Sequence, residues 1–301
     1  MRRLFVGFTC VIALICFESA AAQGKVRSSM IVTTEWLAQH LNDKSLVLIH
    51  VGDKKEYDAA HIPSAQFIQT SDISTPRGQG LILELPPVEQ LKATFEKFGV
   101  TDNSRIIVYF GKDWVTPTSR VYFTLDYLGL GDRTSILDGG MPAWIAEKRT
   151  VTTDVSAPKP GTFTPHPNPK LVVDASWVSA NLNKPGVAIL DARDAKFYTG
   201  ESAGSMPRAG HIPSAKSIPF GSVVEESNKF KSEEALRQIF TTAGVKPNDS
   251  VATYCHIGQQ ASLLYFVAKY LGYDAHLYDG SFQDWSNRKE LPVESSAAAK
   301  P

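Results

Sequence analysis

The strongest constraint on this chain is an internal duplication. The pentapeptide HIPSA occurs at residues 61–65 and again at residues 211–215. Other features recur around it in the same order, as in the pairs Trp36 and Trp177, Asp138 and Asp279, and Trp144 and Trp285. These pairs lie 141 residues apart, a period that has the size of a domain and is too long for a solenoid repeat. The sequence therefore predicts two related domains in tandem.

We place the first domain at residues 30–150 and the second at residues 171–294. Residues 151–170 between them contain five prolines, and proline is not tolerated inside a helix or a central strand. We expect this stretch to be an extended linker. Residues 295–301 are small and polar, and we expect a flexible tail there.

Within each copy, short apolar runs alternate with patterns of helical period. In the second copy, three such runs predict buried strands: residues 187–190, 251–254 and 275–278. Apolar residues between Gln260 and Leu271 recur on one helical face, while Asp174 and Ser232 are suited to cap two further helices. This alternation predicts an α/β fold in which each domain is a mostly parallel sheet flanked by helices.

The composition excludes several classes of protein. Hydrophobic residues make up 43% of the chain, which is enough for a packed core and excludes wholesale disorder. Basic and acidic residues number 31 each, so neither a nucleic acid nor a charged membrane surface is an expected partner. Three cysteines are too few for a disulfide scaffold.

Residues 1–22 have the features of a secretory signal. Arg2 and Arg3 precede an apolar run from Leu4 to Phe17, which at 14 residues is shorter than a membrane span. Three alanines at positions 20–22 provide a cleavage site of small residues. We therefore expect an exported protein, periplasmic or secreted, with no stable membrane span after cleavage. The alternative is an uncleaved membrane anchor.

Cleavage after residue 22 leaves Cys255 as the one cysteine of the mature chain. It follows a predicted strand and precedes a predicted helix, the place where ligands gather in open α/β sheets. The free N–H groups and the positive end of the helix dipole favour a thiolate there. Gly258 allows the loop to curl so that its N–H groups point at the sulfur. The sequence predicts a nucleophilic thiol, and the alternative is a buried cysteine without a chemical role.

Taken together, these features resemble those of the tandem-domain rhodaneses, the thiosulfate or 3-mercaptopyruvate sulfurtransferase family. The resemblance rests on the duplicated unit, the HIPSA turn, the Asp-Gly and Trp near the end of each copy, and the Cys-x-x-Gly loop at residues 255–258. It covers about residues 30–294. It implies two tandem rhodanese-like domains, each a mostly parallel sheet flanked by helices.

The resemblance also implies a reaction, the transfer of a sulfane sulfur in two steps. The Cys255 thiolate takes the outer sulfur of a small anionic donor and becomes a persulfide, which passes the sulfur to cyanide or to a thiol acceptor. Members of the family need no metal and no organic cofactor, so we expect neither, and we expect a monomer. The persulfide anion would be stabilised by main-chain N–H groups of the loop residues His256, Ile257, Gly258, Gln259 and Gln260.

Two arginines resemble family positions that hold the anionic group of the donor. Arg193 follows the first predicted strand of the second copy. Arg208 lies shortly before His211, in a segment nine residues longer than its counterpart in the first copy. A planar guanidinium suits a sulfonate or a carboxylate, and the alternative for both is structural ion pairing. His256 is a further candidate cation for the donor, and its alternative is an exposed loop residue.

The first copy departs from the family pattern. Tyr109 aligns with Tyr254, which puts Phe110 where Cys255 sits in the second copy. We therefore expect the first domain to lack activity and to wall a cleft between the domains.

The His-Ile-Pro sequence occurs in this inactive copy too. We therefore expect His61 and His211 to be structural, each with its ring hydrogen-bonded in a turn.

The loop sequence leaves the identity of the donor open. We favour thiosulfate because His256 is large and can carry a positive charge. The alternatives are 3-mercaptopyruvate as donor, or a non-enzymatic sulfur-relay or binding protein. A rhodanese-fold phosphatase would need an arginine six residues after the cysteine, where this chain has Ala261.

Overall fold

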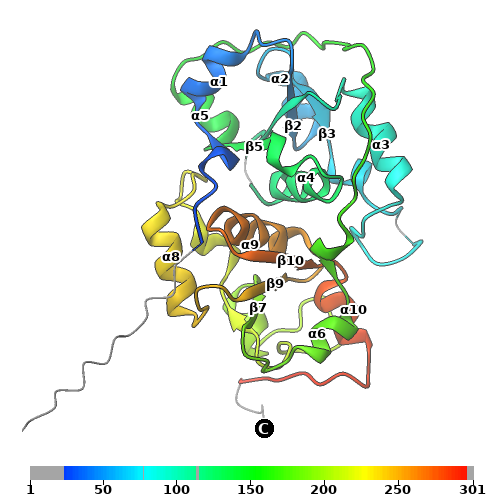
Figure 1. Ribbon diagram of the computed structural model, residues 1–301, viewed down its shortest axis with the longest axis vertical. Helices are drawn as coiled ribbons and strands as arrows, with labels where there is room; N and C mark the ends of the chain where they lie inside the picture. The colour runs from blue at the N-terminus through cyan, green and yellow to red at the C-terminus, as the bar shows by residue number, and fades with distance from the viewer. Residues whose placement is uncertain (1–23, 77, 113–114, 297–301) are drawn as a thin grey trace, which may run out of the picture.

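The structure, a computed structural model, describes residues 24–76, 78–112 and 115–296. The predicted signal segment therefore lies outside the described residues, as does most of the predicted tail. Two five-stranded sheets stand one above the other along the long axis of the molecule (Figure 1). All strand pairs in them are parallel.

The two sheets have the same strand order. The first runs β1 (Ile31–Val32), β5 (Thr134–Leu137), β4 (Arg105–Phe110), β2 (Leu46–Val51) and β3 (Gln66–Ile68). The second runs β6 (Val172–Val173), β10 (Asp274–Tyr278), β9 (Ser250–Tyr254), β7 (Val187–Asp191) and β8 (Lys216–Ser217). This repetition confirms the prediction of two related α/β domains with parallel sheets.

Strands and helices of the second domain begin and end close to where the sequence predicts. The three predicted strands are β7, β9 and β10. The predicted helix after the cysteine is α9 (Gln259–Tyr270). Asp174 caps α6 (Ala175–Ala180) by accepting the N–H of Trp177 at 2.7 Å. Ser232 caps α8 (Glu233–Thr242) in the same way, so both predicted caps are confirmed.

Central strands of both sheets are buried on both faces. In β4, Val108 and Phe110 pack into one hydrophobic cluster, while Ile107 and Tyr109 pack into another on the opposite face. This pattern follows from the period of two along a strand. It also explains why these strands read as continuous apolar runs and not as alternating ones.

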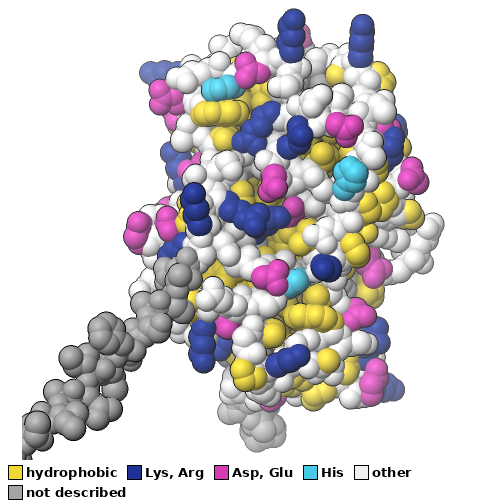
Figure 2. Space-filling view, viewed as in Figure 1, with side chains coloured by type: hydrophobic (Ala, Val, Ile, Leu, Met, Phe, Trp, Pro, Cys, Tyr) yellow, Lys and Arg dark blue, Asp and Glu magenta, His cyan; other side chains and the backbone are white. Residues whose placement is uncertain are grey.

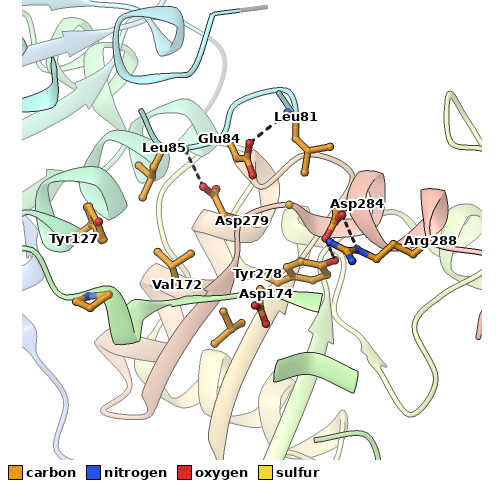
Figure 3. A pocket seen from close by; sticks show the side chains of 13 residues that line it. Leu81, Glu84, Leu85, Tyr127, Val172, Asp174, Tyr278, Asp279, Asp284 and Arg288 are labelled. Atoms are coloured by element: carbon orange, nitrogen blue, oxygen red, sulfur yellow. Dashed lines mark hydrogen bonds and ion pairs between the residues drawn. The ribbon is translucent and has the colours of Figure 1, made fainter. Parts of the chain in front are cut away.

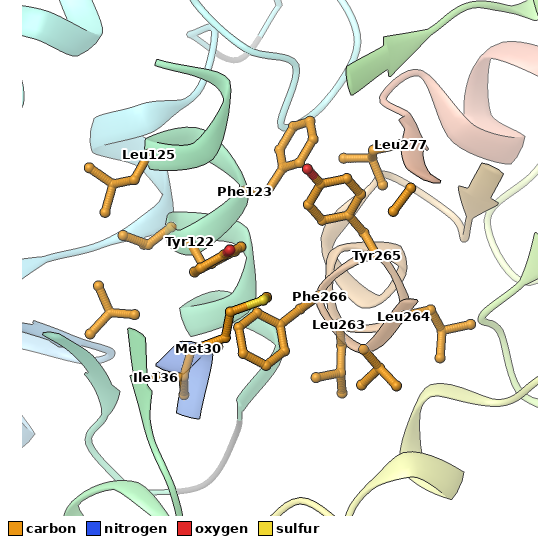
Figure 4. Packing of buried hydrophobic residues seen from close by; sticks show 14 of the residues in the cluster. Met30, Tyr122, Phe123, Leu125, Ile136, Leu263, Leu264, Tyr265, Phe266 and Leu277 are labelled. Atoms are coloured by element: carbon orange, nitrogen blue, oxygen red, sulfur yellow. The ribbon is translucent and has the colours of Figure 1, made fainter. Parts of the chain in front are cut away.

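One hydrophobic core joins the two domains. It contains buried residues of both sheets and of the two helices that meet at the junction, α4 (Val115–Tyr127) and α9. Tyr122 and Phe266 meet edge to face with ring centroids 4.7 Å apart, and Phe123 and Tyr265 do so at 4.9 Å (Figure 4). Such aromatic pairs add to the stability gained by burial. The domains are therefore packed as one body and are not simply tethered.

The outer faces of the two sheets are covered by shorter helices. In the first domain these are α1 (Thr34–His40), α2 (Lys54–Ala59) and α5 (Gly140–Ala146). In the second they are α6, α7 (Ala195–Thr199) and α10 (Ser281–Asn287). The inner faces also carry α3 (Val88–Lys97) and α8. Each sheet thus lies between two helical layers (Figure 1).

The segment between the domains is mostly extended and follows the first domain. Thr152 forms an isolated antiparallel bridge with His61, and Phe163 is buried in the shared core. The segment ends in a short 3₁₀ turn at Pro169–Leu171, directly before β6. Four of its five prolines thus lie outside any helix or strand, as expected from their fixed φ.

The surface agrees with the balanced charge of the sequence. Lys, Arg, Asp and Glu side chains are interspersed over the face seen in Figure 2, without a large block of one sign. Among the described residues, no helix is both long and apolar enough to cross a membrane.

Candidate functional site at the domain junction

The loop after β9 carries the candidate nucleophile. Cys255 directly follows β9, and Gly258 precedes the first residue of α9. Gly258 has a φ of +89°, a left-handed conformation that favours glycine. The turn that it makes brings its main-chain N–H to 3.2 Å from Cys255 Sγ, to which it donates. The predicted curl of the loop around the sulfur therefore forms at this residue.

A second turn, after β10, holds the other side of the cysteine. The main-chain N–H of Cys255 donates to Ser281 Oγ at 3.2 Å. The carbonyl oxygen of Cys255 accepts the N–H of Phe282 at 2.9 Å. Ser281 itself has a φ of +52°, an uncommon conformation for a residue with a side chain. Cys255 is thus fixed between its own loop and the residues at the start of α10.

Two helices begin next to this loop. Gln259 at the start of α9 donates from its side chain to Thr116 Oγ1 near the start of α4, at 3.2 Å. At the far ends of the same helices, Lys269 pairs with Asp126. The helices therefore run in the same direction, and their N-termini lie together. The unpaired N–H groups and positive dipole ends there favour an anion.

The sulfur is not open to solvent. Cys255 is 1% exposed and belongs to the shared hydrophobic core. This corrects the expectation that the thiol opens onto a cleft between the domains. The reason is the closeness of the first domain, whose Thr116 and Arg120 lie against the loop. In this arrangement the sulfur is therefore shielded from molecules in the surrounding solvent.

Arg193 lies just beyond the carboxyl end of β7, where the candidate site is expected, but its guanidinium is bonded to other groups of the protein. It is 1% exposed and forms hydrogen bonds to both carboxylate oxygens of Asp191, the shortest at 2.6 Å. It also donates to the carbonyl oxygen of Gly210 at 2.8 Å and lies over the ring of Phe282. These contacts match the structural alternative that the sequence left open.

Arg208 is likewise held by the protein itself. Its guanidinium donates to four main-chain carbonyl oxygens, those of Trp285, Ser286, Arg288 and Leu291, at 2.7–2.9 Å. These oxygens lie at the end of α10 and beyond it. Arg208 therefore caps the end of this helix, and these contacts match the structural alternative stated for it.

His256 lies beside the nucleophile under the longer segment of the second domain. Its ring meets that of Phe197 edge to face at 4.6 Å. A Cβ placed on Gly204, in the longer segment, would stand 3.8 Å from its Nε2. Burial, and then the nearby charge of Arg193, lower the pKa of His256 below its ordinary value of 6.5. The ring is therefore neutral at neutral pH, and its expected role as a cation is not supported.

The side chains of the remaining loop residues form no hydrogen bond to the sulfur in the described part of the chain. Ile257, Gln259 and Gln260 are half-buried. Among the hydrogen bonds of the described residues, the N–H of Gly258 is the one directed at the sulfur. Of the predicted ring of N–H donors around the sulfur, one donor therefore forms a hydrogen bond to it in this arrangement. The N–H groups of the first turn of α9 have no acceptor within the helix.

The first domain has the same framework without the thiol. Tyr109 and Tyr254 accept the main-chain N–H of Ile62 and Ile212 through their hydroxyl oxygens, each at 3.1 Å. This equivalence confirms the alignment that puts Phe110 in place of the cysteine.

The structure confirms the structural reading of the two His-Ile-Pro histidines. His61 Nδ1 lies 2.7 Å from the carbonyl oxygen of Tyr57, and His211 Nδ1 lies 2.7 Å from that of Tyr198. Each histidine ring also stacks on the ring of the tyrosine whose carbonyl oxygen it contacts, with the ring centroids 3.8 Å apart.

Sequence reasoning missed two residues that contact the site. The sequence did contain a signal for Ser281, because this residue ends the Asp-Gly-Ser stretch whose counterpart in the first copy is Asp-Gly-Gly. Arg120 gave no signal, since it lies in α4 of the domain that lacks the nucleophile. It is 0% exposed and pairs with Asp279 at 2.6 Å.

A cavity of about 530 Å³ lies on the other side of the turn after β10 (Figure 3). Leu81, Glu84 and Leu85 of the first domain line it together with Asp279 and Gly280. Leu85 donates its N–H to Asp279 at 2.9 Å, and burial raises the pKa of Glu84. Cys255 is not among the lining residues, so this cavity is separate from the thiol.

The described residues contain no group of three or more His, Cys, Asp or Glu side chains placed to hold a metal ion.

Comparison with known proteins agrees with this geometry. The family model of the rhodanese-like domain matches residues 33–147 and again residues 174–288. Each match contains one complete sheet except for its first short strand.

Several curated relatives cover nearly the whole chain. The sulfur carrier protein TtuD of Thermus thermophilus is 30% identical over 90% of this chain and 98% of its own. A probable 3-mercaptopyruvate sulfurtransferase of Pseudomonas aeruginosa is 30% identical, with coverages of 88% and 98%. The thiosulfate sulfurtransferase of Azotobacter vinelandii is 28% identical, with coverages of 86% and 94%.

Solved structures extend the likeness in fold. The wild-type structure of EanB superposes with a TM-score of 0.79 at 22% identity, covering 89% of this chain and 70% of that protein. At this identity the likeness concerns the fold alone. The family match and the full-length relatives decide the assignment: the chain belongs to the rhodanese-like domain family and carries two such domains in tandem.

Proposed function

We propose that the protein is a sulfurtransferase that moves a sulfane sulfur from a small anionic donor, thiosulfate or 3-mercaptopyruvate, to cyanide or a thiol through a persulfide on Cys255. The observation that carries the proposal is the hydrogen bond from Gly258 N–H to Cys255 Sγ, in the loop of the domain that kept its cysteine. Relatives named as thiosulfate and 3-mercaptopyruvate sulfurtransferases support the class of enzyme.

The reaction needs two displacements at sulfur. The Cys255 thiolate attacks the outer sulfur of thiosulfate, an S–S bond forms, and the S–S bond of thiosulfate breaks with sulfite as the leaving group. The acceptor then attacks the terminal sulfur of the persulfide. With cyanide this gives thiocyanate and returns the electron pair to Cys255 as thiolate.

The site is built to stabilise negative charge on sulfur. The Gly258 N–H already donates to Cys255 Sγ. In the persulfide, the charge moves to the terminal sulfur, one bond further out, where the free N–H groups at the start of α9 become available. The adjoining start of α4 adds a second positive dipole end.

The structure supports the choice between the two sulfur donors less strongly than it supports the class of reaction. His256 is neutral at neutral pH, so its charge no longer favours thiosulfate over 3-mercaptopyruvate. Both donors remain candidates, because relatives of similar identity carry both names.

A sulfur carrier is the second candidate function. It is supported by the relative named as a sulfur carrier protein and by the 1% exposure of Cys255, which protects a bound sulfur from solvent. A carrier loads Cys255 but needs a partner protein to release the sulfur.

A single set of measurements separates these candidates. Purified mature protein is supplied with thiosulfate or 3-mercaptopyruvate, and thiocyanate release in the presence of cyanide is followed at steady state. Mass spectrometry records the added mass of one sulfur atom on Cys255. An enzyme shows loading and turnover, whereas a carrier shows loading alone.

Cys255→Ser is the matched control, since it keeps the size of the side chain but cannot form a persulfide. We expect complete loss of loading and turnover with an unchanged circular dichroism spectrum. Near-normal turnover of this variant would overturn the proposal.

We also propose that the protein is exported. The support is the sequence of residues 1–22, which lie outside the described residues. Mass spectrometry of protein recovered from cell fractions tests this. A mature chain beginning at Gln23 outside the cytoplasm is expected, and an intact first residue in the cytoplasm would refute it.

A further inference from the structure

Arg120 is a cation of the inactive domain that is buried at the junction. It lies in α4 and is 0% exposed. Its Nη1 pairs with Asp279 Oδ1 at 2.6 Å, and its Nη2 donates to the carbonyl oxygen of Leu83 at 2.5 Å. Its Nε has no hydrogen-bond partner among the described residues. Burying a guanidinium with one donor unsatisfied costs free energy.

Two of the groups beside the Arg120 guanidinium, Gly258 and Asp279, belong to the surroundings of the thiol. Nη1 lies 3.2 Å from the position of a Cβ placed on Gly258, whose N–H donates to Cys255 Sγ. Asp279 begins the turn that ends in Ser281, and Ser281 Oγ accepts the N–H of Cys255. One guanidinium therefore lies next to the thiol loop on one side and pairs with the supporting turn on the other.

We propose that Arg120 is a positioning residue through which the first domain holds the thiol loop of the second in its working geometry. It acts through Gly258 and Asp279 and does not touch the sulfur in this arrangement. This gives the domain without a nucleophile a part in the reaction. The proposal rests on the proposed function only in taking Cys255 as the reactive group.

Removing Arg120 is expected to change the hydrogen-bond geometry around the thiol. Without Arg120, the carboxylate of Asp279 is left buried at 6% exposure without its cation, and the turn is expected to shift towards solvent to rehydrate it. Ser281 moves with that turn. Space opened behind Gly258 lets its N–H turn away from Cys255 Sγ, and the bond that favours negative sulfur weakens.

The chain offers a matched control at the same interface. Asp126 of α4 pairs with Lys269 of α9 and also accepts the Tyr265 hydroxyl. This pair also crosses between the domains and is nearly as buried, with side chains 7% and 13% exposed. It lies at the far ends of the two helices. Breaking it tests the interface without disturbing the thiol loop.

The experiment compares Arg120→Met, Arg120→Lys and Lys269→Met with the parent protein. The readouts are the rate of Cys255 alkylation by iodoacetamide as a function of pH, and kcat and KM for thiosulfate. For Arg120→Met we expect about a tenfold slower alkylation at neutral pH, a profile displaced to higher pH, and a fall in kcat larger than the change in KM. Arg120→Lys should recover part of the loss, because it restores the charge without the fork.

Lys269→Met should lower the thermal midpoint yet keep the alkylation rate within about twofold. If Arg120→Met fails to fold, Arg120→Met/Asp279→Asn removes both charges and should still slow alkylation, because the guanidinium behind Gly258 is absent there too. A folded Arg120 variant whose alkylation profile superimposes on that of the parent overturns the proposal. Alkylation needs no sulfur donor, so a parent protein without sulfur transfer refutes the proposed function while leaving this test intact.

Discussion

Gly140 and Ser281 occupy equivalent positions in the two domains and have the same φ of +52°. A Cβ on Gly140 would stand 2.8 Å from the ring of Phe110, so only glycine leaves room for that ring. In the second domain Phe110 is replaced by the smaller Cys255, and Ser281 uses the space to accept the N–H of the cysteine. The copy with the cysteine therefore has a serine that bonds to it, and the copy with phenylalanine has a glycine that makes room for the ring.

Gly258→Ala should disable the loop. Its φ of +89° is unfavourable for alanine, and the new Cβ would lie 3.1 Å from the Asp279 carbonyl oxygen. We expect a loss of about 1–3 kcal/mol in the free energy of unfolding and at least about a tenfold loss in kcat/KM. Denaturant unfolding and the thiocyanate assay measure the two.

Gly186→Ala is the control for this prediction. Gly186 has a similar φ of +81°, but nothing lies within 4 Å of its added Cβ. It should cost about 1 kcal/mol of stability with unchanged turnover. Equal activity of the two variants would show that the Gly258 N–H is dispensable.

Arg193→Ala should affect stability more than substrate affinity. The substitution leaves Asp191 as a buried carboxylate without its cation, which costs about 3–5 kcal/mol. Both side chains are at most 1% exposed, so solvent screening gives little relief. Denaturant unfolding and KM for thiosulfate should be compared. A raised KM at unchanged stability would restore Arg193 to the donor site that the sequence predicts.

His256→Gln tests whether the ring acts as a cation. Because burial lowers the pKa of His256, the ring carries no charge at pH 7.5. Replacing it with neutral glutamine should change KM for thiosulfate by less than about twofold at that pH. Only in the parent protein should KM fall as the pH drops well below 6.5, where the ring gains a proton. A large rise in KM at pH 7.5 would contradict this.

His50 should make the first domain sensitive to acid. Burial, with a smaller effect of His61, lowers the pKa of His50 from 6.5 to about 4. The unfolded chain therefore binds a proton here at a higher pH than the folded chain. The free energy of unfolding falls as the pH drops from 6.5 towards 4, by about 3 kcal/mol over the whole interval.

Urea unfolding at pH 7.5 and pH 5 checks this prediction in the parent protein and in His50→Gln. The variant has no titrating group at this position, so the difference between its two free energies should be smaller by about 2 kcal/mol. Equal differences in both proteins would exclude His50 as the acid-sensitive group.

The duplication and the local periodicity were enough to predict the fold. Strands such as β9 and caps such as Asp174 follow from neighbouring residues, so they can be read without knowing what packs against them. The same holds for Phe110, which marks the copy without this cysteine, and for Gly258, whose conformation is local. The exposure of Cys255 could not be predicted, because it depends on how closely α4 approaches α9.

The sequence by itself determined two parallel α/β domains, the position of Cys255 in the loop after β9, and a glycine that turns this loop around the sulfur, since each is encoded within a few residues of chain. Only the tertiary structure decided which partners the charged side chains take. It paired Arg193 with Asp191, placed Arg208 on the carbonyls beyond α10, and brought Arg120 across the junction to Asp279. The physical reason is that a buried guanidinium takes whichever acceptors surround it, and these come from segments far apart in the sequence.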